Sequence, residues 1–471
     1  MSGVSGRLAT LWLTLVIGTY LLVGVLFAVY TPDWQAPDEP AHYNYVRYLA
    51  EQGRFPVLQQ GDYPQDYLEE IKSQKFPAHL SIDPIRYEFH QPPLYYLLAA
   101  PVYELFDGAL LPLRLLSVIL GGGLVYVAYR LVLAVCPTQS MLALGAAAFV
   151  AFVPMHMAMA AAVNNDTLAE LLLALVLWGL IRYQGGEAER TRDLVGLGVL
   201  LGLGLLTKRW GLVGVVVAVA AVTLRRRRDP RRMARELVWL LIPALLLALP
   251  WLARNVAVYG WPDLMGQARH DEVVLGQPTT AKWIADYGWR YLIGQGVRTT
   301  YCSFWGKFGW MAVLMDRRIY LALSLFAAVA TAGFIWWLVS VWASFRRSGQ
   351  VGILNPSKDA TSARLHPLTT PGCLGAPAVL LLLSVLLTLF SYLWYNTKFV
   401  QHQGRYLFPA LIPLGLVLAL GWWTVVRRAG ALVARTAWPA RVNRLLFASP
   451  YAGLAALDVV CLFAFIVPYL S

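Results

Sequence analysis

Long apolar runs alternate with short polar stretches along most of the chain. Most of the runs approach the roughly 20 residues that a helix needs to cross a bilayer. Inside a bilayer the backbone must satisfy its own hydrogen bonds, so we read these runs as helices and not as barrel strands. The pattern predicts about 11 spans: Leu8–Tyr30, Leu111–Val135, Met141–Val163, Thr167–Tyr183, Leu194–Leu206, Trp210–Leu224, Leu237–Val258, Ile319–Phe345, Ala376–Tyr395, Leu407–Val426 and Phe447–Tyr469.

Two longer stretches separate these runs and are mostly not apolar: residues 31–108 and residues 259–318. In the first, Tyr45, Tyr48 and Leu49 have the spacing of one helical face, which predicts an amphipathic helix at the membrane interface. A second such helix is expected from Pro92, because proline is tolerated in a first helical turn.

The composition supports the membrane assignment. Hydrophobic residues make up 58% of the chain and charged residues 14%, with 18 tryptophans and a mean hydropathy of +0.55. No ordinary soluble domain has this profile. We therefore predict an all-α polytopic membrane protein, and we treat residues 1–471 as one membrane domain because no repeat or boundary is apparent.

The net charge of +13 arises from arginines that cluster in short loops, above all in the run at residues 225–235. This distribution follows the positive-inside rule and does not resemble a nucleic-acid surface, so no nucleic-acid partner is expected. It places the N-terminus in the cytoplasm and residues 31–108 and 259–318 outside the cytoplasmic membrane. Arg7 precedes an apolar run without a small-residue cleavage site, which predicts an uncleaved first helix.

Two adjacent carboxylates, Asp38 and Glu39, follow the first span directly, and His42 comes one turn later. Carboxylates in an external loop are usually just solvated. Next to aromatic side chains at a membrane surface, however, a carboxylate can have a raised pKa and act as a general base near neutral pH. His42 is a site candidate, although packing against tyrosines would also explain it.

Further polar residues lie at the predicted outer ends of the apolar runs, where positive charge runs against the inside bias. An anionic ligand with a lipid tail is the simplest common cause. Snorkelling to headgroups is the alternative for Arg114, and helix capping is the alternative for Asp166. Gly404, beside Arg405, would let a backbone or ligand approach closely. The candidates are the cations Arg114, Lys208, Arg254 and Arg405, with Glu88, His90, Gln91, Asn165, Asp166, Lys398, His402 and Tyr406.

Several segments in order resemble the GT-C superfamily of glycosyltransferases, which includes protein O-mannosyltransferases, lipid A aminoarabinose transferases and their uncharacterised bacterial relatives. The segments are PDEPAH, FHQPPLYYLL, LPLRLLSVILGG, VNNDTLAELLLAL, LLGLGLLTK, WLARNVAVYG and QGRYLFPALIPL. One departure concerns Gln91, because those families have lysine or histidine directly before the two prolines, whereas here His90 precedes an inserted Gln91.

The resemblance implies transfer of a sugar, with inversion, from a polyprenyl-phosphate donor to a hydroxyl acceptor on a protein, lipid or glycan. By position, Asp38 is the expected general base and Glu39 shapes or assists it. The expected phosphate ligands are Arg114 together with Lys208, Arg254 or Arg405. A divalent metal could bridge Asp38 or Glu39 to the phosphate, but metal use varies in the superfamily and no cofactor is assigned.

Two other functions fit parts of the pattern. A flippase or transporter of lipid-linked saccharides would use the same cations, but it should show inverted repeats or polar sites at the membrane midplane. A membrane scaffold would use the external loops to bind partners, but it leaves the pairing of Asp38 and Glu39 with cations unexplained.

Overall fold

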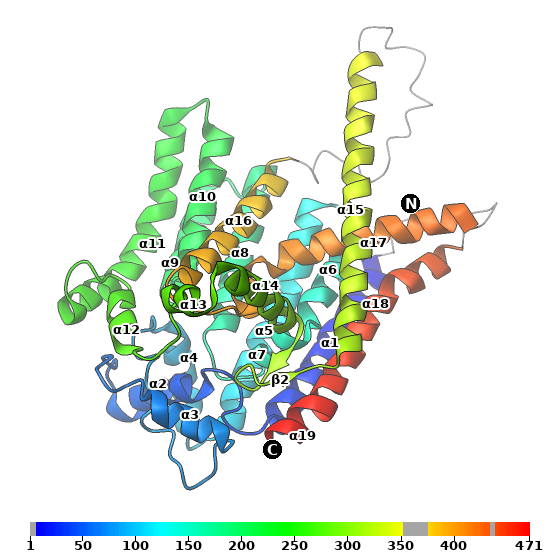
Figure 1. Cartoon of the computed structure of the whole chain (residues 1–471). Helices are drawn as coiled ribbons and strands as arrows, with labels where there is room; N and C mark the ends of the chain where they lie inside the picture. The colour runs from blue at the N-terminus through cyan, green and yellow to red at the C-terminus, as the bar shows by residue number, and fades with distance from the viewer. Residues whose placement is uncertain (1–5, 352–374, 434–438) are drawn as a thin grey trace.

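The computed structural model describes residues 6–351, 375–433 and 439–471 (Figure 1). The predicted loop before Leu374 lies almost entirely outside these ranges. The elements are α1 Gly6–Tyr30, α2 Glu39–Gln52, α3 Gln65–Ser73, α4 Leu94–Leu105, α5 Leu110–Val135, α6 Ser140–Ala151, α7 Pro154–Ala160, α8 Asp166–Gly185, α9 Thr191–Leu205, α10 Gly211–Arg226, α11 Pro230–Tyr259, α12 Gln267–Val273, α13 Thr280–Tyr287, α14 Trp289–Trp305, β1 Lys307–Phe308, β2 Val313–Leu314, α15 Arg317–Val351, α16 Ala376–Asn396, the 3₁₀ helix η2 Gly404–Ala410, α17 Leu411–Val433, α18 Ala440–Val460, the π-helical segment η3 Cys461–Ile466 and α19 Val467–Leu470.

The membrane-spanning helices agree with the sequence prediction in place and roughly in number. Within the described ranges, eight helical stretches are long and apolar enough to cross a membrane, and the bent pair α6–α7 would make a ninth. The 15-residue α9 and the 16-residue α10 lie where the sequence predicted two short spans, but they are shorter than the helices counted here. The protein is thus a multi-pass, all-α membrane protein.

One predicted span, Met141–Val163, is not a single helix. α6 and α7 meet at an angle of 64°, because Pro154 begins α7 and Val153 before it is extended, at φ −75° and ψ 117°. A proline cannot donate the backbone hydrogen bond of a continuing helix and disfavours helical geometry in the residue before it. The bend brings the chain back toward the end of the bundle where α8 begins.

Close contact between spans depends on small residues. α15 packs along α17, and an added Cβ on Gly421 would lie only 1.8 Å from the carbonyl oxygen of Ala330. On the other side of the bundle, a Cβ on Gly198 of α9 would lie 2.3 Å from the carbonyl oxygen of Leu240 in α11. Without a hydrophobic force between helices in lipid, such close backbone approach is what holds spans together.

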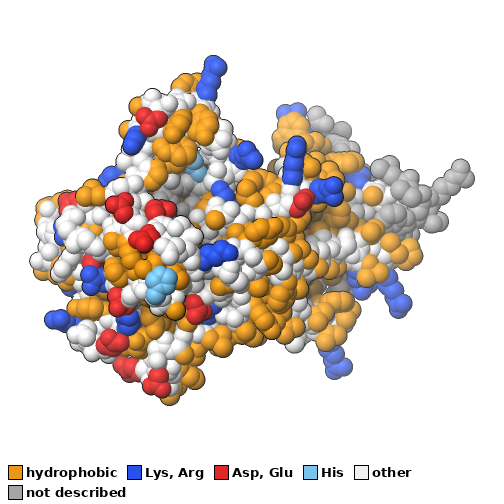
Figure 2. Space-filling model, turned by 60° about the horizontal axis from the view of Figure 1, so that its bottom comes forward, with side chains coloured by type: hydrophobic (Ala, Val, Ile, Leu, Met, Phe, Trp, Pro, Cys, Tyr) orange, Lys and Arg blue, Asp and Glu red, His pale blue; other side chains and the backbone are white. Residues whose placement is uncertain are grey.

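Residues 31–108 fold over one end of the bundle, at the bottom of Figure 1. As predicted, this region contains a helix with a buried face, α2, and the short apolar α4; it also contains α3, which the sequence did not indicate. Figure 2 shows charged side chains of both signs gathered on this end, beside surface that is mostly hydrophobic. The arginine-rich turn between α10 and α11 lies at the opposite end, as the charge pattern predicts.

Residues 259–318 also form ordered structure that the sequence did not indicate in detail: α12, α13, α14 and a two-stranded antiparallel pair, β1–β2. This segment is joined to residues 31–108 by side-chain hydrogen bonds. The hydroxyl of Tyr259 accepts from the amide of Leu58 at 3.1 Å, and the Trp310 indole donates to the Trp34 carbonyl at 3.0 Å. The two polar segments therefore pack against each other on the same end of the bundle.

Candidate active site

A cavity that opens to solvent lies at this end, with about 860 Å³ of empty space when its open mouth is included. It draws side chains from both polar segments and from the ends of the spans. Its lining contains three carboxylates, three cations and three histidines among the described residues. The lining residues are Asp38, His42, Glu88, His90, Gln91, Pro92, Asp166, Lys208, Arg209, Trp210, Met265, Gln267, His270, Ser391, Tyr392, Tyr395, Arg405 and Tyr406.

Four helices begin at the wall of this cavity. Asp38 is the N-cap of α2, Pro92 lies two residues before α4, Asp166 opens α8, and Trp210 is the N-cap of α10. The unsatisfied amides and the dipole at a helix N-terminus favour negative charge. The fold therefore directs several partial positive charges toward one space.

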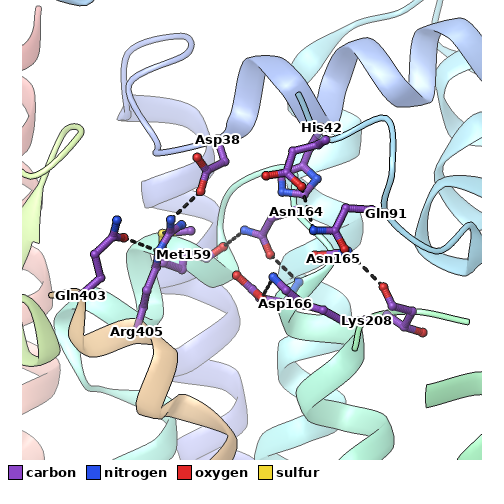
Figure 3. Close-up of polar contacts among 12 residues, drawn as sticks. Asp38, His42, Gln91, Met159, Asn164, Asn165, Asp166, Lys208, Gln403 and Arg405 are labelled. Atoms are coloured by element: carbon purple, nitrogen blue, oxygen red, sulfur yellow. Dashed lines mark hydrogen bonds and ion pairs between the residues drawn. The ribbon is translucent and has the colours of Figure 1, made fainter. Parts of the chain in front are cut away.

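Asp38 and Arg405, 367 residues apart, form an ion pair in the cavity wall (Figure 3). Nη2 of Arg405 lies 2.5 Å from Oδ2 of Asp38, and the Tyr87 hydroxyl donates to Oδ1 at 2.7 Å. The backbone of Asp38 is left-handed, at φ 68°. Aspartate tolerates this conformation better than most residues, and such outliers gather at functional sites.

The ion pair decides the acidity of Asp38. Burial raises the pKa of this carboxyl, but the charge of Arg405, the hydrogen bond from Tyr87 and nearby His42 together lower it to about 2. The sequence prediction of a raised pKa for Asp38 is therefore wrong for this structure. It considered burial beside aromatic residues and left out the guanidinium, whose charge favours the ionised form.

Gly404 positions Arg405. Its amide donates to Oγ of Ser303 in α14 at 2.7 Å, and an added Cβ would lie 2.2 Å from the backbone nitrogen of Phe304. The predicted close approach at this glycine is confirmed, and its partner is the backbone of α14. Nε of Arg405 also donates to the Gln403 side chain at 2.7 Å, which fixes the plane of the guanidinium (Figure 3).

The other two cations of the cavity come from the turn between α9 and α10. Lys208 is paired with Asp166 and lies over the Trp210 ring at 4.9 Å. Arg209 donates to the neutral side chain of Gln267 at 2.7 Å. Its guanidinium has no carboxylate partner among the described residues. Asp166 is the first residue of α8, whose N-cap is Asn165, and its carboxylate pairs with Lys208, so helix capping does not explain this aspartate.

His42 and His90 line the cavity as buried histidines. Nδ1 of His42 lies 2.8 Å from the Tyr96 hydroxyl, and the His90 ring is 4.6 Å from that of His270. Burial lowers the pKa of both, that of His90 well below its ordinary value with His270 adding to the effect. Burial therefore favours the neutral form of both rings.

Glu39 does not reach the cavity. It is fully buried and forms a two-point ion pair with Arg114, at 2.8 Å from Nε and 2.7 Å from Nη2. Arg114 also donates to the carbonyls of Ala28 and Thr31 at the end of α1, at 3.1 and 2.8 Å. These hydrogen bonds are all with protein groups, and Arg114 does not line the cavity.

Three more candidates lie outside the cavity lining. Arg254 donates to the Pro56 carbonyl and packs on the ring of Trp251. Lys398 pairs with Asp271, and His402 lies against Gly296 of α14. These residues join the polar segments to the spans.

Asn165 is buried behind the cavity and touches it through Gln91, whose side-chain oxygen accepts from it at 3.2 Å. Tyr406 lines the cavity, as expected for a site residue. Of the candidates, the structure thus gathers in the cavity wall Asp38, His42, Glu88, His90, Gln91, Asp166, Lys208, Arg405 and Tyr406.

The sequence prediction missed part of the cavity. Arg209 could have been included as a candidate, because it lies beside Lys208 at the tip of the same two short helices. Gln267 and His270 lie in the second polar segment, and Tyr392 and Tyr395 lie near the end of α16. The polar character of the segment and the aromatic residues at a helix end were visible, but nothing in the pattern singled out these side chains.

Within residues 6–351, 375–433 and 439–471, no three His, Cys, Asp or Glu side chains are grouped so that they could hold a metal ion. The acids that the sequence pointed to as metal bridges each have a cation in contact, Arg405 for Asp38 and Arg114 for Glu39.

Comparisons with known proteins agree with this architecture. The family model of dolichyl-phosphate-mannose-protein mannosyltransferases matches residues 90–253, which include the last quarter of the first polar segment and the turn that carries Lys208. A comparison with curated protein sequences gave no match.

Two solved structures are similar over nearly the whole chain. An Archaeoglobus fulgidus oligosaccharyltransferase tethered to an acceptor peptide is 13% identical, with a TM-score of 0.53 over 95% of this chain and 55% of that one. This chain therefore spans about half the length of that enzyme. ArnT from Cupriavidus metallidurans bound to undecaprenyl phosphate is 16% identical, with a TM-score of 0.49 over 98% of this chain and 74% of that one. This chain is thus similar over residues 90–253 to the dolichyl-phosphate-mannose-protein mannosyltransferases, and it shares its fold with the oligosaccharyltransferase.

Proposed function

We propose that this protein transfers a sugar from a polyprenyl-phosphate donor to a hydroxyl group of an acceptor, with inversion at the anomeric carbon, on the external face of the cytoplasmic membrane. The observation that carries the proposal is the cavity in which Asp38 meets Arg405 beside two further cations, Lys208 and Arg209. The matched family model, whose name specifies a dolichyl-phosphate-mannose donor, supports this donor class.

The phosphate subsite consists of Arg405, Lys208 and Arg209. A phosphodiester carries one negative charge, and guanidinium groups bind its oxygens through two parallel hydrogen bonds. The N-termini of α8 and α10 beside these cations add partial positive charge. The lipid tail would leave this end of the bundle along the apolar surface of the spans.

The chemistry needs one bond to form and one to break. The acceptor oxygen bonds to the anomeric carbon as the bond from that carbon to the phosphate oxygen breaks, and the phosphate leaves with the electron pair. Asp38 accepts the proton of the acceptor hydroxyl. The three cations stabilise the charge that grows on the leaving phosphate, a contribution that is largest in a site with little water.

When a donor binds, its phosphate would compete with Asp38 for Arg405. A phosphate that engages Arg405 removes the strongest influence that lowers the pKa of Asp38. The pKa of the carboxyl then moves back up, which makes Asp38 a better base at the moment when the donor is in place. Donor binding thereby prepares the base for the acceptor.

Glu39 has a structural role in this proposal and not the role of assisting the base that was expected from the sequence. Its ion pair with Arg114 and its contact with the amide of Val163, at 3.1 Å, tie the first turn of α2 to α1, α5 and the start of α8. Since Asp38 is the preceding residue, this connection fixes the backbone that carries the base.

The test is transfer by purified protein in liposomes that contain undecaprenyl-phosphate-linked hexoses and a crude acceptor fraction from the cell envelope. We expect release of undecaprenyl phosphate together with a glycosylated product. Movement of labelled lipid across the bilayer without release of undecaprenyl phosphate would instead identify a transporter and contradict the proposal.

A further inference from the structure

Glu88 differs from the other two carboxylates of the cavity. Asp38 and Asp166 each contact a cation. Glu88 lines the same cavity with 9% of its surface exposed, and the neutral amide of Gln91 donates to its Oε2 at 2.8 Å. Among the described residues, no cation lies within ion-pair distance of this carboxylate.

A chain of hydrogen bonds holds the carboxylate in one orientation. Buried Asn165 donates from Nδ2 to the Thr207 carbonyl at 3.0 Å and to Oε1 of Gln91 at 3.2 Å. This contact turns the NH₂ group of Gln91 toward Glu88 (Figure 3 shows Asn165 and Gln91). Oε2 of Glu88 is thus engaged, while Oε1 accepts no hydrogen bond from the described residues.

A phosphate would be repelled by this carboxylate, so Glu88 does not belong to the phosphate subsite. Oε1 of Glu88 is open to the cavity, so it is available to a ligand that supplies hydrogen-bond donors. The donors must come from a neutral or positively charged group that enters the cavity. The part of a polyprenyl-phosphate donor that fits is its sugar, whose ring carries neighbouring hydroxyls.

The surroundings of Glu88 suit a sugar ring. Glu88 and His42 line the same cavity, and Nδ1 of His42 contacts the hydroxyl of Tyr96. Tyr395 and Tyr406 line it as well, so aromatic side chains stand beside the carboxylate. Resting on the proposed function, we propose that Glu88, oriented by Gln91 and Asn165, is the specificity residue that accepts hydrogen bonds from hydroxyls of a hexose in the donor.

The test compares a sugar-free lipid with three hexosyl lipids and needs no acceptor. Binding of sugar-free undecaprenyl phosphate and of undecaprenyl-phosphate-linked glucose, mannose and galactose is measured with purified wild type, Glu88→Gln and Glu104→Gln. Glu104 is an exposed acid on α4 and serves as the matched control. We expect wild type to bind one of the hexosyl lipids more tightly than the sugar-free lipid.

In Glu88→Gln the affinity for that hexosyl lipid should fall about tenfold, because a hydrogen bond to a charged acceptor is replaced by one to a neutral acceptor. The affinity for sugar-free lipid should not change, and Glu104→Gln should behave as wild type. Gln91→Ala removes the hydrogen bond that orients the Glu88 carboxylate, so it should give a smaller loss of affinity for the same lipid. Glu88→Gln and Gln91→Ala together separate sugar recognition by Glu88 from damage to the fold.

Three results would overturn the subsite. Equal loss of both lipids in Glu88→Gln would mean that Glu88 maintains the cavity and does not read the sugar. Unchanged hexosyl-lipid binding in Glu88→Gln would remove Glu88 from recognition. A wild type that binds sugar-free lipid but none of the hexosyl lipids more tightly would exclude an uncharged hexose at this position. Failure to bind any of the four lipids is a distinct outcome, which contradicts the proposed donor class and the subsite with it.

Discussion

Two acid–arginine pairs begin at adjacent positions of the chain and lie in different surroundings. The pair of Asp38 with Arg405 is in the wall of the cavity, and the aspartate side chain is 22% exposed. The pair of Glu39 with Arg114 lies behind it, at 0% and 2% exposure, and Arg114 is surrounded by backbone carbonyls. Both are close contacts between the same kinds of groups, and only one of them can be reached by a ligand.

The difference shows that the start of one helix can supply both a residue that faces the cavity and a residue that pairs inside the protein. At the first turn of α2, successive residues point to different sides, so Asp38 faces the cavity and Glu39 faces the spans. An accessible pair can exchange its partner for a substrate phosphate. An enclosed pair cannot exchange, and loss of either partner leaves an uncompensated buried charge. Substitutions in the two pairs should therefore affect different measurements.

The largest effect is expected for Asp38→Asn. Loss of the base should slow sugar transfer by about 10²-fold to 10⁴-fold, the usual contribution of general acid–base catalysis. At neutral pH the variant should also lack the roughly 2 kcal/mol that the ionised carboxyl contributes to stability, so turnover is measured on the protein that remains folded. The measurement is turnover with a hexosyl lipid donor, with Asp33→Asn as the control from the same loop. Full activity of Asp38→Asn would exclude Asp38 as the base.

Arg114→Ala should act on stability instead. It leaves Glu39 buried without its cation, which costs about 3–5 kcal/mol in comparable pairs. We expect a clear drop in the thermal unfolding temperature in detergent, while the protein that remains folded binds undecaprenyl phosphate as wild type does. Arg130→Ala, on the same helix but without a carboxylate partner among the described residues, is the control. Weakened lipid binding with unchanged stability would return Arg114 to the phosphate subsite.

The acidity of Asp38 predicts a stability change at low pH. In the folded protein the pKa of Asp38 is lowered from 3.8 to about 2. A group with a lowered folded pKa stabilises the fold above its unfolded pKa, and that contribution is lost as the pH falls through the folded value. Between pH 4 and pH 2, wild type should therefore lose about 2 kcal/mol that Asp38→Asn does not lose.

Thermal unfolding of the two proteins over this range measures the difference between them, which cancels the titration of the other acids. A loss of equal size in both would show that the ion pair with Arg405 does not hold the carboxyl ionised. Saturating undecaprenyl phosphate should shift the loss in wild type to higher pH, because the phosphate takes Arg405 away from Asp38.

Much of the architecture follows from the sequence, because the length of an apolar run and the position of arginines are local properties. The bend at Pro154 could also have been read locally, from the proline itself. The pairing of Asp38 with Arg405 could not be predicted from the sequence, because the two residues are 367 positions apart. They are brought together by the packing of α14 against Gly404. For the same reason, the sequence assigned Arg114 to a phosphate when its partner was the neighbouring acid of the motif, Glu39.

The smallest effect tests the exchange of partners directly. If Asp38 and a donor phosphate compete for Arg405, removal of the aspartate charge frees the arginine. Asp38→Asn should then bind sugar-free undecaprenyl phosphate about fivefold more tightly than wild type, a gain at the lower end of typical coupling between two ligands of one group. Arg405→Gln should bind it more weakly, and the double variant should resemble Arg405→Gln alone, because no arginine remains for Asp38 to withhold. Equal affinity of wild type and Asp38→Asn would mean that the two anions do not share Arg405, and the cavity pair would then be as fixed as the pair of Glu39 with Arg114.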